Sequence, residues 1–169
     1  MLALGERFPA DRDYVRHGEK VERLDIADSG KDTRDVKDPP LSMVGMARAE
    51  KSSQMLSATN ITAIYVTQYQ RTAMFAAPLA KRQGITPTVM PAADTAALIK
   101  RIAAHSADAD ADAVALVVGH SNTVPLILKR LGVVEAVTLN EDEYDNLFLV
   151  MPKPGAAPTV TRLKYWLAG

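Results

Sequence analysis

Apolar positions along the chain occur as short runs and as longer segments in which apolar residues recur every three or four positions. Strands are predicted at about 12–16, 61–67, 87–90, 113–118, 146–151 and 159–166. Helices are predicted at about 42–57, 71–83, 94–105 and 124–131. Because strands alternate with helices, the pattern predicts an α/β fold whose mainly parallel central sheet is covered by helices on both faces.

Residues with known preferences for helix ends support three of these boundaries. Ser42 is a candidate N-cap of the first helix, because a serine hydroxyl can accept a hydrogen bond from a free backbone N–H there. Gly84 and Gly132 follow the second and fourth helices. Glycine readily adopts the left-handed conformation that ends a helix, so both are expected to stop the helices that precede them.

Two segments fit the pattern less well. Arg12 and Asp13 make the first strand polar, whereas a central strand of a parallel sheet is usually apolar throughout. Residues 1–11 have no clear period and are expected to form a loose arm. Residues 19–40 are also polar and aperiodic, and such a segment is either a functional cover near a site or a solvated surface excursion. The sequence leaves both possibilities open.

Size and charge narrow the classes of function. The chain has 169 residues, an ordinary length for one domain, and a single domain over 1–169 is expected. Lysine plus arginine and aspartate plus glutamate each number 20, so the formal net charge is zero. This balance argues against non-specific binding of nucleic acid, which needs a basic excess. Any site for an anion must therefore be local.

Cysteine usage and hydropathy exclude further classes. The absence of cysteine rules out a disulfide scaffold, a thiolate metal site and a cysteine nucleophile. Apolar runs are far too short to span a bilayer, so no membrane partner is expected. Charged residues near the N-terminus interrupt any signal-peptide pattern. A cytoplasmic protein is the default expectation, with a secreted or periplasmic one left open if a leader is missing from this chain.

Three polar motifs follow predicted strands. Arg16-His17-Gly18 ends the first strand, Arg71 lies shortly after the strand at 61–67, and Gly119-His120 directly follows the strand at 113–118. The carboxyl ends of parallel strands lie at one edge of a sheet, which is where ligands bind in such folds. The three motifs are therefore expected to meet in one site.

The side chains of these motifs suit a phosphoryl group. A phosphate monoester carries roughly −1.5 to −2 charges near neutral pH, and guanidinium groups match its oxygens, so Arg16 and Arg71 are the proposed clamp. His17 fits the role of nucleophile, since a neutral imidazole is competent when its far nitrogen is held. Gly18 would let the backbone turn close to the phosphate, and His120 would donate to an equatorial oxygen. The scheme requires neither a metal nor a cofactor.

The same motifs resemble the histidine phosphatase superfamily, also called the phosphoglycerate mutase-like family. The resemblance includes Arg16-His17-Gly18 with Glu19, Asp38-Pro39-Pro40-Leu41-Ser42-Met43-Val44-Gly45, Arg71-Thr72 and Gly119-His120-Ser121. It implies a three-layer α/β/α sandwich and a transient phosphohistidine on His17. It also implies that Arg16, Arg71 and His120 bind the phosphate, and that water completes hydrolysis.

The compact length is similar to the short bacterial branch of that family, which includes phosphohistidine phosphatases. Phosphoglycerate mutases are longer and carry an inserted lid segment that this sequence lacks, so a phosphatase is favoured over a mutase. The expected partner is a small phosphorylated substrate or a phosphoprotein, and the oligomeric state is left open. The alternatives are a phosphate-binding or regulatory member with impaired catalysis and a phosphoglycerate mutase-type phosphotransferase.

The leaving-group acid and some family positions are less well matched. Lys20 stands where a small hydroxyl residue is common in the family, and Phe75 replaces a frequent threonine. In many relatives a carboxylate follows the third strand, and Asp94 is the nearest match here. Glu19 and the acidic residues of the 19–38 segment compete with Asp94 for this role. Asp94 can equally be the N-cap of the helix that follows it.

Structural or rival roles exist for the other candidates. Arg71 can be a solvated first-turn residue, although a cation is not favoured at a helix N-terminus unless an anion lies there. His120 can be a hydrogen-bonded core histidine at a strand end. Gly119-His120-Ser121-Asn122-Thr123 also resembles the nucleophile elbow of α/β-hydrolases. That motif needs glycine at the position of Thr123 and a histidine after Ser121, and neither is present.

Overall fold

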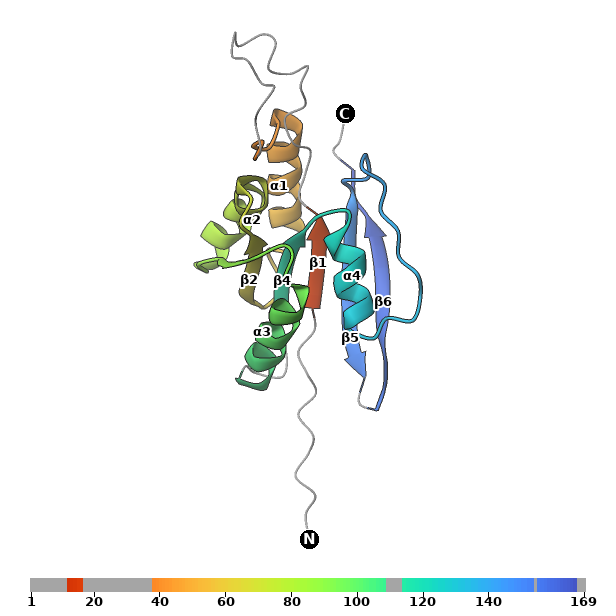
Figure 1. The fold of residues 1–169 in the computed structure, drawn as a ribbon. Coiled ribbons are helices and arrows are strands. Elements are labelled where there is room, and N and C mark those ends of the chain that lie inside the picture. The colour runs from red at the N-terminus through yellow and green to blue at the C-terminus, as the bar shows by residue number, and fades with distance from the viewer. Residues whose placement is uncertain (1–11, 17–37, 109–113, 154, 167–169) are drawn as a thin grey trace.

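The computed structural model describes residues 12–16, 38–108, 114–153 and 155–166, drawn in colour in Figure 1. Its strands are β1 (Arg12–Arg16), β2 (Ile61–Thr67), β3 (Thr88–Met90), β4 (Val114–Gly119), β5 (Asn146–Lys153) and β6 (Ala156–Lys164). Its helices are α1 (Met43–Met55), α2 (Gln70–Gln83), α3 (Thr95–Asp108) and α4 (Thr123–Arg130). Each element expected from the sequence is present. Residues 1–11 and most of the 19–40 segment lie outside the described residues.

The three helix-end predictions are confirmed. The Ser42 hydroxyl accepts a hydrogen bond from the Gly45 backbone N–H at 3.1 Å, as an N-cap does. Gly84 ends α2 with a φ of 68°, and Gly132 follows α4 with a φ of 91°. Both values lie in the left-handed region that glycine adopts at little cost.

The six strands form one sheet in the order β3-β2-β4-β1-β5-β6. β1, β2, β3 and β4 run parallel to one another, whereas β5 is antiparallel to β1 and β6 is antiparallel to β5. The sheet is therefore parallel over four strands, with an antiparallel pair added at one side. This arrangement confirms the expected α/β class with a mainly parallel sheet.

β1 lies inside the sheet, although its sequence is polar. Arg12 pairs with Ala115 of β4 on one side and with Val150 of β5 on the other. The ladder on both sides is made by backbone N–H and C=O groups, which every non-proline residue provides whatever its side chain. The polar start of β1 therefore does not prevent an interior position. Its last residue, Arg16, pairs with Gly119 at the end of β4.

Two apolar clusters lie on opposite faces of the sheet. Leu116 and Val118 of β4 belong to the cluster under α1 and α2, while Ala115 and Val117 belong to the cluster under α3 and α4. This alternation follows from the two-residue period of a strand. Helices thus cover both faces, and the structure is the expected three-layer sandwich (Figure 1).

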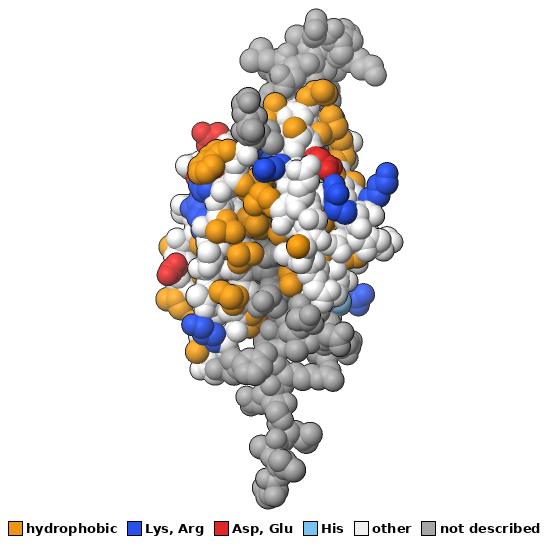
Figure 2. All heavy atoms as spheres, turned by 180° about the vertical axis from the view of Figure 1, so that it is seen from behind, with side chains coloured by type: hydrophobic (Ala, Val, Ile, Leu, Met, Phe, Trp, Pro, Cys, Tyr) orange, Lys and Arg blue, Asp and Glu red, His pale blue; other side chains and the backbone are white. Residues whose placement is uncertain are grey.

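The surface carries charges of both signs. On the face drawn in Figure 2, blue and red side chains of the described residues stand among apolar and neutral ones. This mixture agrees with a formal net charge of zero. No helix in the described part of the chain has the length and apolar character needed to cross a membrane.

Candidate active site

Three parallel strands end side by side at one edge of the sheet. Arg16, the last residue of β1, pairs with Gly119, the last residue of β4. Val66 of β2 pairs with Val118 of β4, so β2 ends at the same level. The segments that follow these strand ends include the motifs singled out in the sequence. His17, Gly18 and Glu19 lie outside the described residues, and of Arg16 only the backbone is described.

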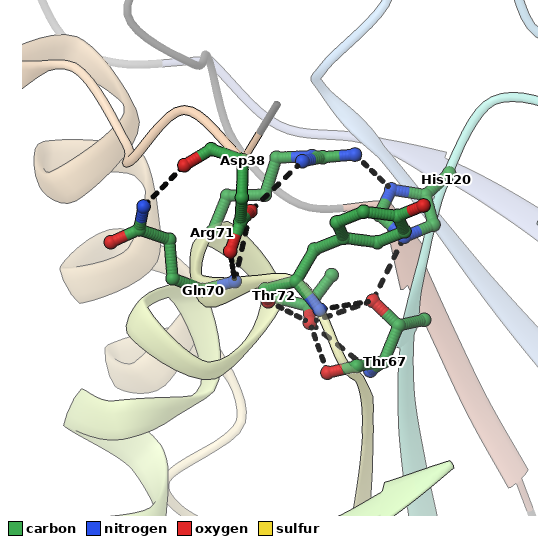
Figure 3. Close-up of polar contacts among 7 residues, drawn as sticks. Asp38, Thr67, Gln70, Arg71, Thr72 and His120 are labelled. Atoms are coloured by element: carbon green, nitrogen blue, oxygen red, sulfur yellow. Dashed lines mark hydrogen bonds and ion pairs between the residues drawn. The ribbon is translucent and has the colours of Figure 1, made fainter. Parts of the chain in front are cut away.

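The structure brings Arg71 and His120 together, although they are 49 positions apart in the chain. Nη2 of Arg71, in the first turn of α2, lies 3.4 Å from Nδ1 of His120, which directly follows β4 (Figure 3). Both side chains line one cavity of about 440 Å³ at the carboxyl ends of the strands. A guanidinium and an imidazole therefore face a common space large enough for a small ligand.

The hydrogen bonds of His120 indicate its tautomer. Arginine has no acceptor, so Nδ1 of His120 must accept the bond from Arg71. Nε2 then carries the proton and donates to Oγ1 of Thr67, 2.9 Å away at the end of β2. His120 is nearly buried, and its backbone N–H donates to Oγ1 of Thr123 at 2.9 Å. These bonds fit the tautomer with its proton on Nε2 and with Nδ1 directed toward Arg71.

Thr67 and Thr72 form a hydrogen-bonded pair next to His120, and Thr67 contacts Nε2 of its ring. Their Oγ1 atoms lie 3.0 Å apart, and Oγ1 of Thr72 is 2.8 Å from the carbonyl oxygen of Tyr69, to which it donates. The Thr67 backbone N–H donates to Oγ1 of Thr72 at 3.0 Å. These bonds tie the end of β2 to the first turn of α2 (Figure 3). No sequence pattern marks this role of Thr67, because its partner His120 lies on another element.

Arg71 has an anionic partner in Asp38, which accounts for a cation at the start of a helix. Nη1 of Arg71 lies 3.4 Å from Oδ1 of Asp38, and the arginine side chain is 14% exposed. The Asp38 carboxylate also accepts from the Gln70 backbone N–H, at 3.0 Å and 3.2 Å. The N-cap residue Tyr69 makes no side-chain cap bond of its own. Asp38 therefore caps α2 from a distant part of the chain.

Tyr69 packs against both predicted phosphate-binding groups. Its ring centroid is 4.5 Å from Cζ of Arg71, a cation–π distance, and 5.3 Å from the ring centroid of His120 at an interplanar angle of 85°. The ring therefore limits the movement of both side chains. The one sequence signal for Tyr69 was an aromatic residue between a strand end and a helix start.

Asp94 occupies the position of a helix cap. Its Oδ1 accepts from the Ala97 backbone N–H at 2.9 Å, and its carbonyl oxygen accepts from the Leu98 N–H. Its side chain is exposed, and the neighbouring Ala92 and Ala93, but not Asp94, are among the described residues lining the cavity. The structure thus shows the capping role that the sequence offered as the alternative. A role for Asp94 as acid stays a prediction.

Glu141 and Ser121 line the cavity as well. Ser121 belongs to the Gly119-His120-Ser121 motif, whereas no sequence motif includes Glu141. Ser121 donates a hydrogen bond to Oε1 of Glu141, which lies on the connection between α4 and β5. No sequence pattern links these residues, because the connection has no period. Within the described ranges, no three histidine or acidic side chains gather as metal ligands would.

A comparison with protein families adds independent information about the motifs. Residues 14–95 match the model of the histidine phosphatase superfamily (branch 1). The matched segment contains Arg16-His17-Gly18 and Arg71, whereas His120 lies beyond it. The resemblance to the histidine phosphatase superfamily is confirmed. Phe75, which departs from the pattern of that superfamily, is buried in the core beneath α2.

Solved structures of the histidine phosphatase and phosphoglycerate mutase-like fold are similar to this chain. They include a mycobacterial glucosyl-3-phosphoglycerate phosphatase (13% identity, TM-score 0.66, 92% of this chain and 98% of that one). The protein histidine phosphatase SixA in complex with tungstate has 14% identity and a TM-score of 0.69, over 91% and 96% of the two chains. The phosphoglycerate mutase of Bacillus anthracis has 13% identity and a TM-score of 0.66, over 91% and 92%.

These similarities establish the fold and leave the substrate open. The expected phosphoglycerate mutase-like sandwich is confirmed, because each of these structures covers most of both chains. Their identities to this chain are low, and their activities differ from one another. A search among curated proteins finds no match.

Proposed function

We propose that the protein is a metal-independent histidine phosphatase that hydrolyses phosphomonoesters or phosphohistidine through a phosphohistidine intermediate on His17. The observation that carries the proposal is the pairing of the Arg71 guanidinium with the His120 imidazole in one cavity beyond the strand ends. These are two of the groups that the superfamily resemblance assigns to phosphate binding. Arg16, a third, ends the strand beside Gly119.

Each group has a defined part in the reaction. His17 attacks phosphorus, so that a P–N bond forms while the bond from phosphorus to the leaving group breaks. Arg16 and Arg71 offset the charge on the equatorial oxygens. The leaving group takes a proton from an acid, for which Asp94, Glu19 and the acidic residues of the 19–38 segment are the candidates. Water then breaks the P–N bond and releases inorganic phosphate.

His120 requires a change of protonation in this scheme. In the structure its Nδ1 accepts from Arg71, whereas donation to a phosphate oxygen needs a proton on Nδ1. Nε2 can keep its bond to Thr67 throughout, since it donates in both forms. Phosphate binding is therefore accompanied by protonation of the ring, which the negative charge of the ligand favours.

The test is hydrolysis of an aryl phosphate by the wild type and by His17→Ala. The variant is expected to lose activity to the detection limit, because no nucleophile remains, and the wild type is expected to stay active with chelators. A quench that avoids acid should trap an acid-labile, base-stable phosphoenzyme in the wild type alone.

His105→Ala is the matched control, because His105 bonds to Thr62 at 2.8 Å and is not among the described residues lining the cavity. Activity that survives in His17→Ala contradicts the mechanism. Phosphate binding without turnover in the wild type favours the regulatory alternative, and isomerisation without phosphate release favours a mutase.

A further inference from the structure

The cavity extends beyond the groups assigned to the phosphate. Its described lining consists of Gln68, Tyr69, Arg71, Ala92, Ala93, His120, Ser121, Asn122, Thr123 and Glu141. Its volume of about 440 Å³ lies in the range typical of sites for small molecules, about 300–1,000 Å³. The cavity therefore has room for a leaving group in addition to a phosphoryl group.

Charge is distributed unevenly over this lining. Among the described lining residues, Arg71 is the one arginine or lysine and Glu141 the one carboxylate. Glu141 is held by Ser121, which directly follows His120 and donates to its Oε1. His120 and Ser121, the hydrogen-bond partner of Glu141, thus lie on the same turn. Glu141 faces the same cavity as the phosphate-binding groups while belonging to a different segment.

A carboxylate in this place discriminates between leaving groups. An ionised glutamate accepts hydrogen bonds and donates none, so it favours hydroxyl groups on a ligand. It also repels a second anionic group bound in the same cavity, and because Glu141 is exposed, salt screens part of this repulsion. Gln68 and Asn122, which also line the cavity, offer further donors and acceptors to hydroxyls.

We propose that Glu141 is a specificity-determining residue that selects phosphomonoesters whose leaving group is neutral and rich in hydroxyls. It disfavours leaving groups that carry a carboxylate or a second phosphate, because a built-in repulsion is an effective source of specificity. The proposal rests on the phosphatase function proposed above and names the substrate class of the same site.

The experiment compares glycerol 3-phosphate with 3-phosphoglycerate, which share a carbon skeleton and differ by a carboxylate. Wild-type kcat/KM is expected to favour glycerol 3-phosphate by about tenfold or more, and Glu141→Gln to bring the ratio close to one, mainly through KM. Para-nitrophenyl phosphate, whose leaving group has neither hydroxyl donors nor a carboxylate, reports whether each protein is active. Asp142→Asn is the control, because it removes the same charge at a neighbouring exposed position.

The outcomes separate this inference from the proposed function. If the wild type hydrolyses the aryl phosphate and Glu141→Gln keeps the wild-type ratio, the role of Glu141 is wrong and the phosphatase function stands. If the wild type hydrolyses no phosphate, the proposed function fails. In that case the role of Glu141 is tested by calorimetric binding of glycerol 3-phosphate and 3-phosphoglycerate. A ratio of their affinities that Glu141→Gln leaves unaltered overturns this role. A ratio that moves toward one supports it.

Discussion

Thr67 fixes the side of the His120 ring that is turned away from Arg71. Its hydroxyl lies 2.9 Å from Nε2 of His120 and 3.0 Å from the hydroxyl of Thr72. Both threonines are buried, so water cannot easily replace either bond. With Nε2 committed to this contact, Nδ1 is left to face the cavity. Thr67 is thus a positioning residue for His120.

The change Thr67→Val tests this role. Valine keeps the branched shape but removes the hydroxyl that accepts from Nε2 of His120. An unpaired buried donor costs about 1–3 kcal/mol, and about 1.4 kcal/mol corresponds to a tenfold change in rate. We expect kcat/KM for an aryl phosphate to fall about tenfold, with a shifted pH profile because the ring is no longer held as one tautomer.

Thr62→Val is the control for this prediction, since Thr62 lies on the same strand and bonds to His105 instead. It is expected to keep wild-type kinetics. Rescue of activity by Thr67→Ser, which restores the hydroxyl, would support positioning by the bond. An unchanged pH profile in Thr67→Val would show that His120 does not depend on Thr67.

At the scale of elements, the close packing of β4 against the start of α4 depends on Gly119. A Cβ atom at this position would lie 2.9 Å from Cγ2 of Val124 and 3.0 Å from Oγ1 of Thr123. The first of these distances is shorter than real contacts allow, and both partners are buried. Glycine therefore permits α4 to begin directly against the strand end that carries His120.

Gly119→Ala is expected to move this junction. Overpacking of a buried site costs about 1–3 kcal/mol, so the free energy of unfolding in urea should fall by that amount. The folded fraction should also lose activity. The Thr123 hydroxyl accepts a hydrogen bond from the His120 backbone N–H, so a shift of Thr123 would displace His120.

Gly84→Ala is the comparison for this variant. It is expected to cost about 1–2 kcal/mol through its left-handed backbone, and to leave kcat unchanged in the folded fraction. A Gly119→Ala protein with full activity would show that the close packing at this junction has no functional role.

At the scale of the whole molecule, charged groups fasten the connection after α4 to the edge strand β6. Glu143 accepts from Lys164 and from Arg162, each at 3.1 Å, and Asp145 accepts from Lys164 at 2.9 Å. The pKa of Glu143 lies below its ordinary value, because its carboxylate accepts from the Asn140 backbone N–H and then from Lys164. The bond to Asp145, followed by that to Glu143, raises the pKa of Lys164.

The directions of these shifts determine how the fastening responds to pH. A lowered folded pKa means that the contribution of Glu143 to stability is present above its ordinary value of 4.5 and is lost as pH falls through the folded pKa. Glu143→Gln should therefore lose less thermal stability than the wild type as the pH is lowered from about 6 to about 3. Glu135→Gln, an exposed change on the same connection, is the control. If the thermal stability of Glu143→Gln and of the wild type falls equally as the pH is lowered, Glu143 does not stabilise this connection.

The sequence predicted the fold well because the fold depends on local patterns. Apolar runs and periods placed each described strand and helix, and strand-end motifs placed Arg71 and His120 in one site. Side-chain composition was a poorer indicator for β1, whose backbone pairing makes it interior despite Arg12.

Residues missed in the site share a different property. Thr67, Tyr69 and Glu141 act through partners on other elements, and Asp38 caps a helix 32 positions away. Such contacts exist only after the chain has folded, so no local pattern marks them. The three sequence motifs, by contrast, combine residue type with position at a strand end.

The edge-on contact between Tyr69 and His120 provides a natural spectroscopic reporter. A nearby aromatic ring displaces the magnetic resonance frequencies of the imidazole carbon-bound protons. The chain has three histidines, so these signals are few and each can be assigned by substitution. Titration with tungstate or vanadate would then follow occupancy of the cavity directly, in solution and without any turnover.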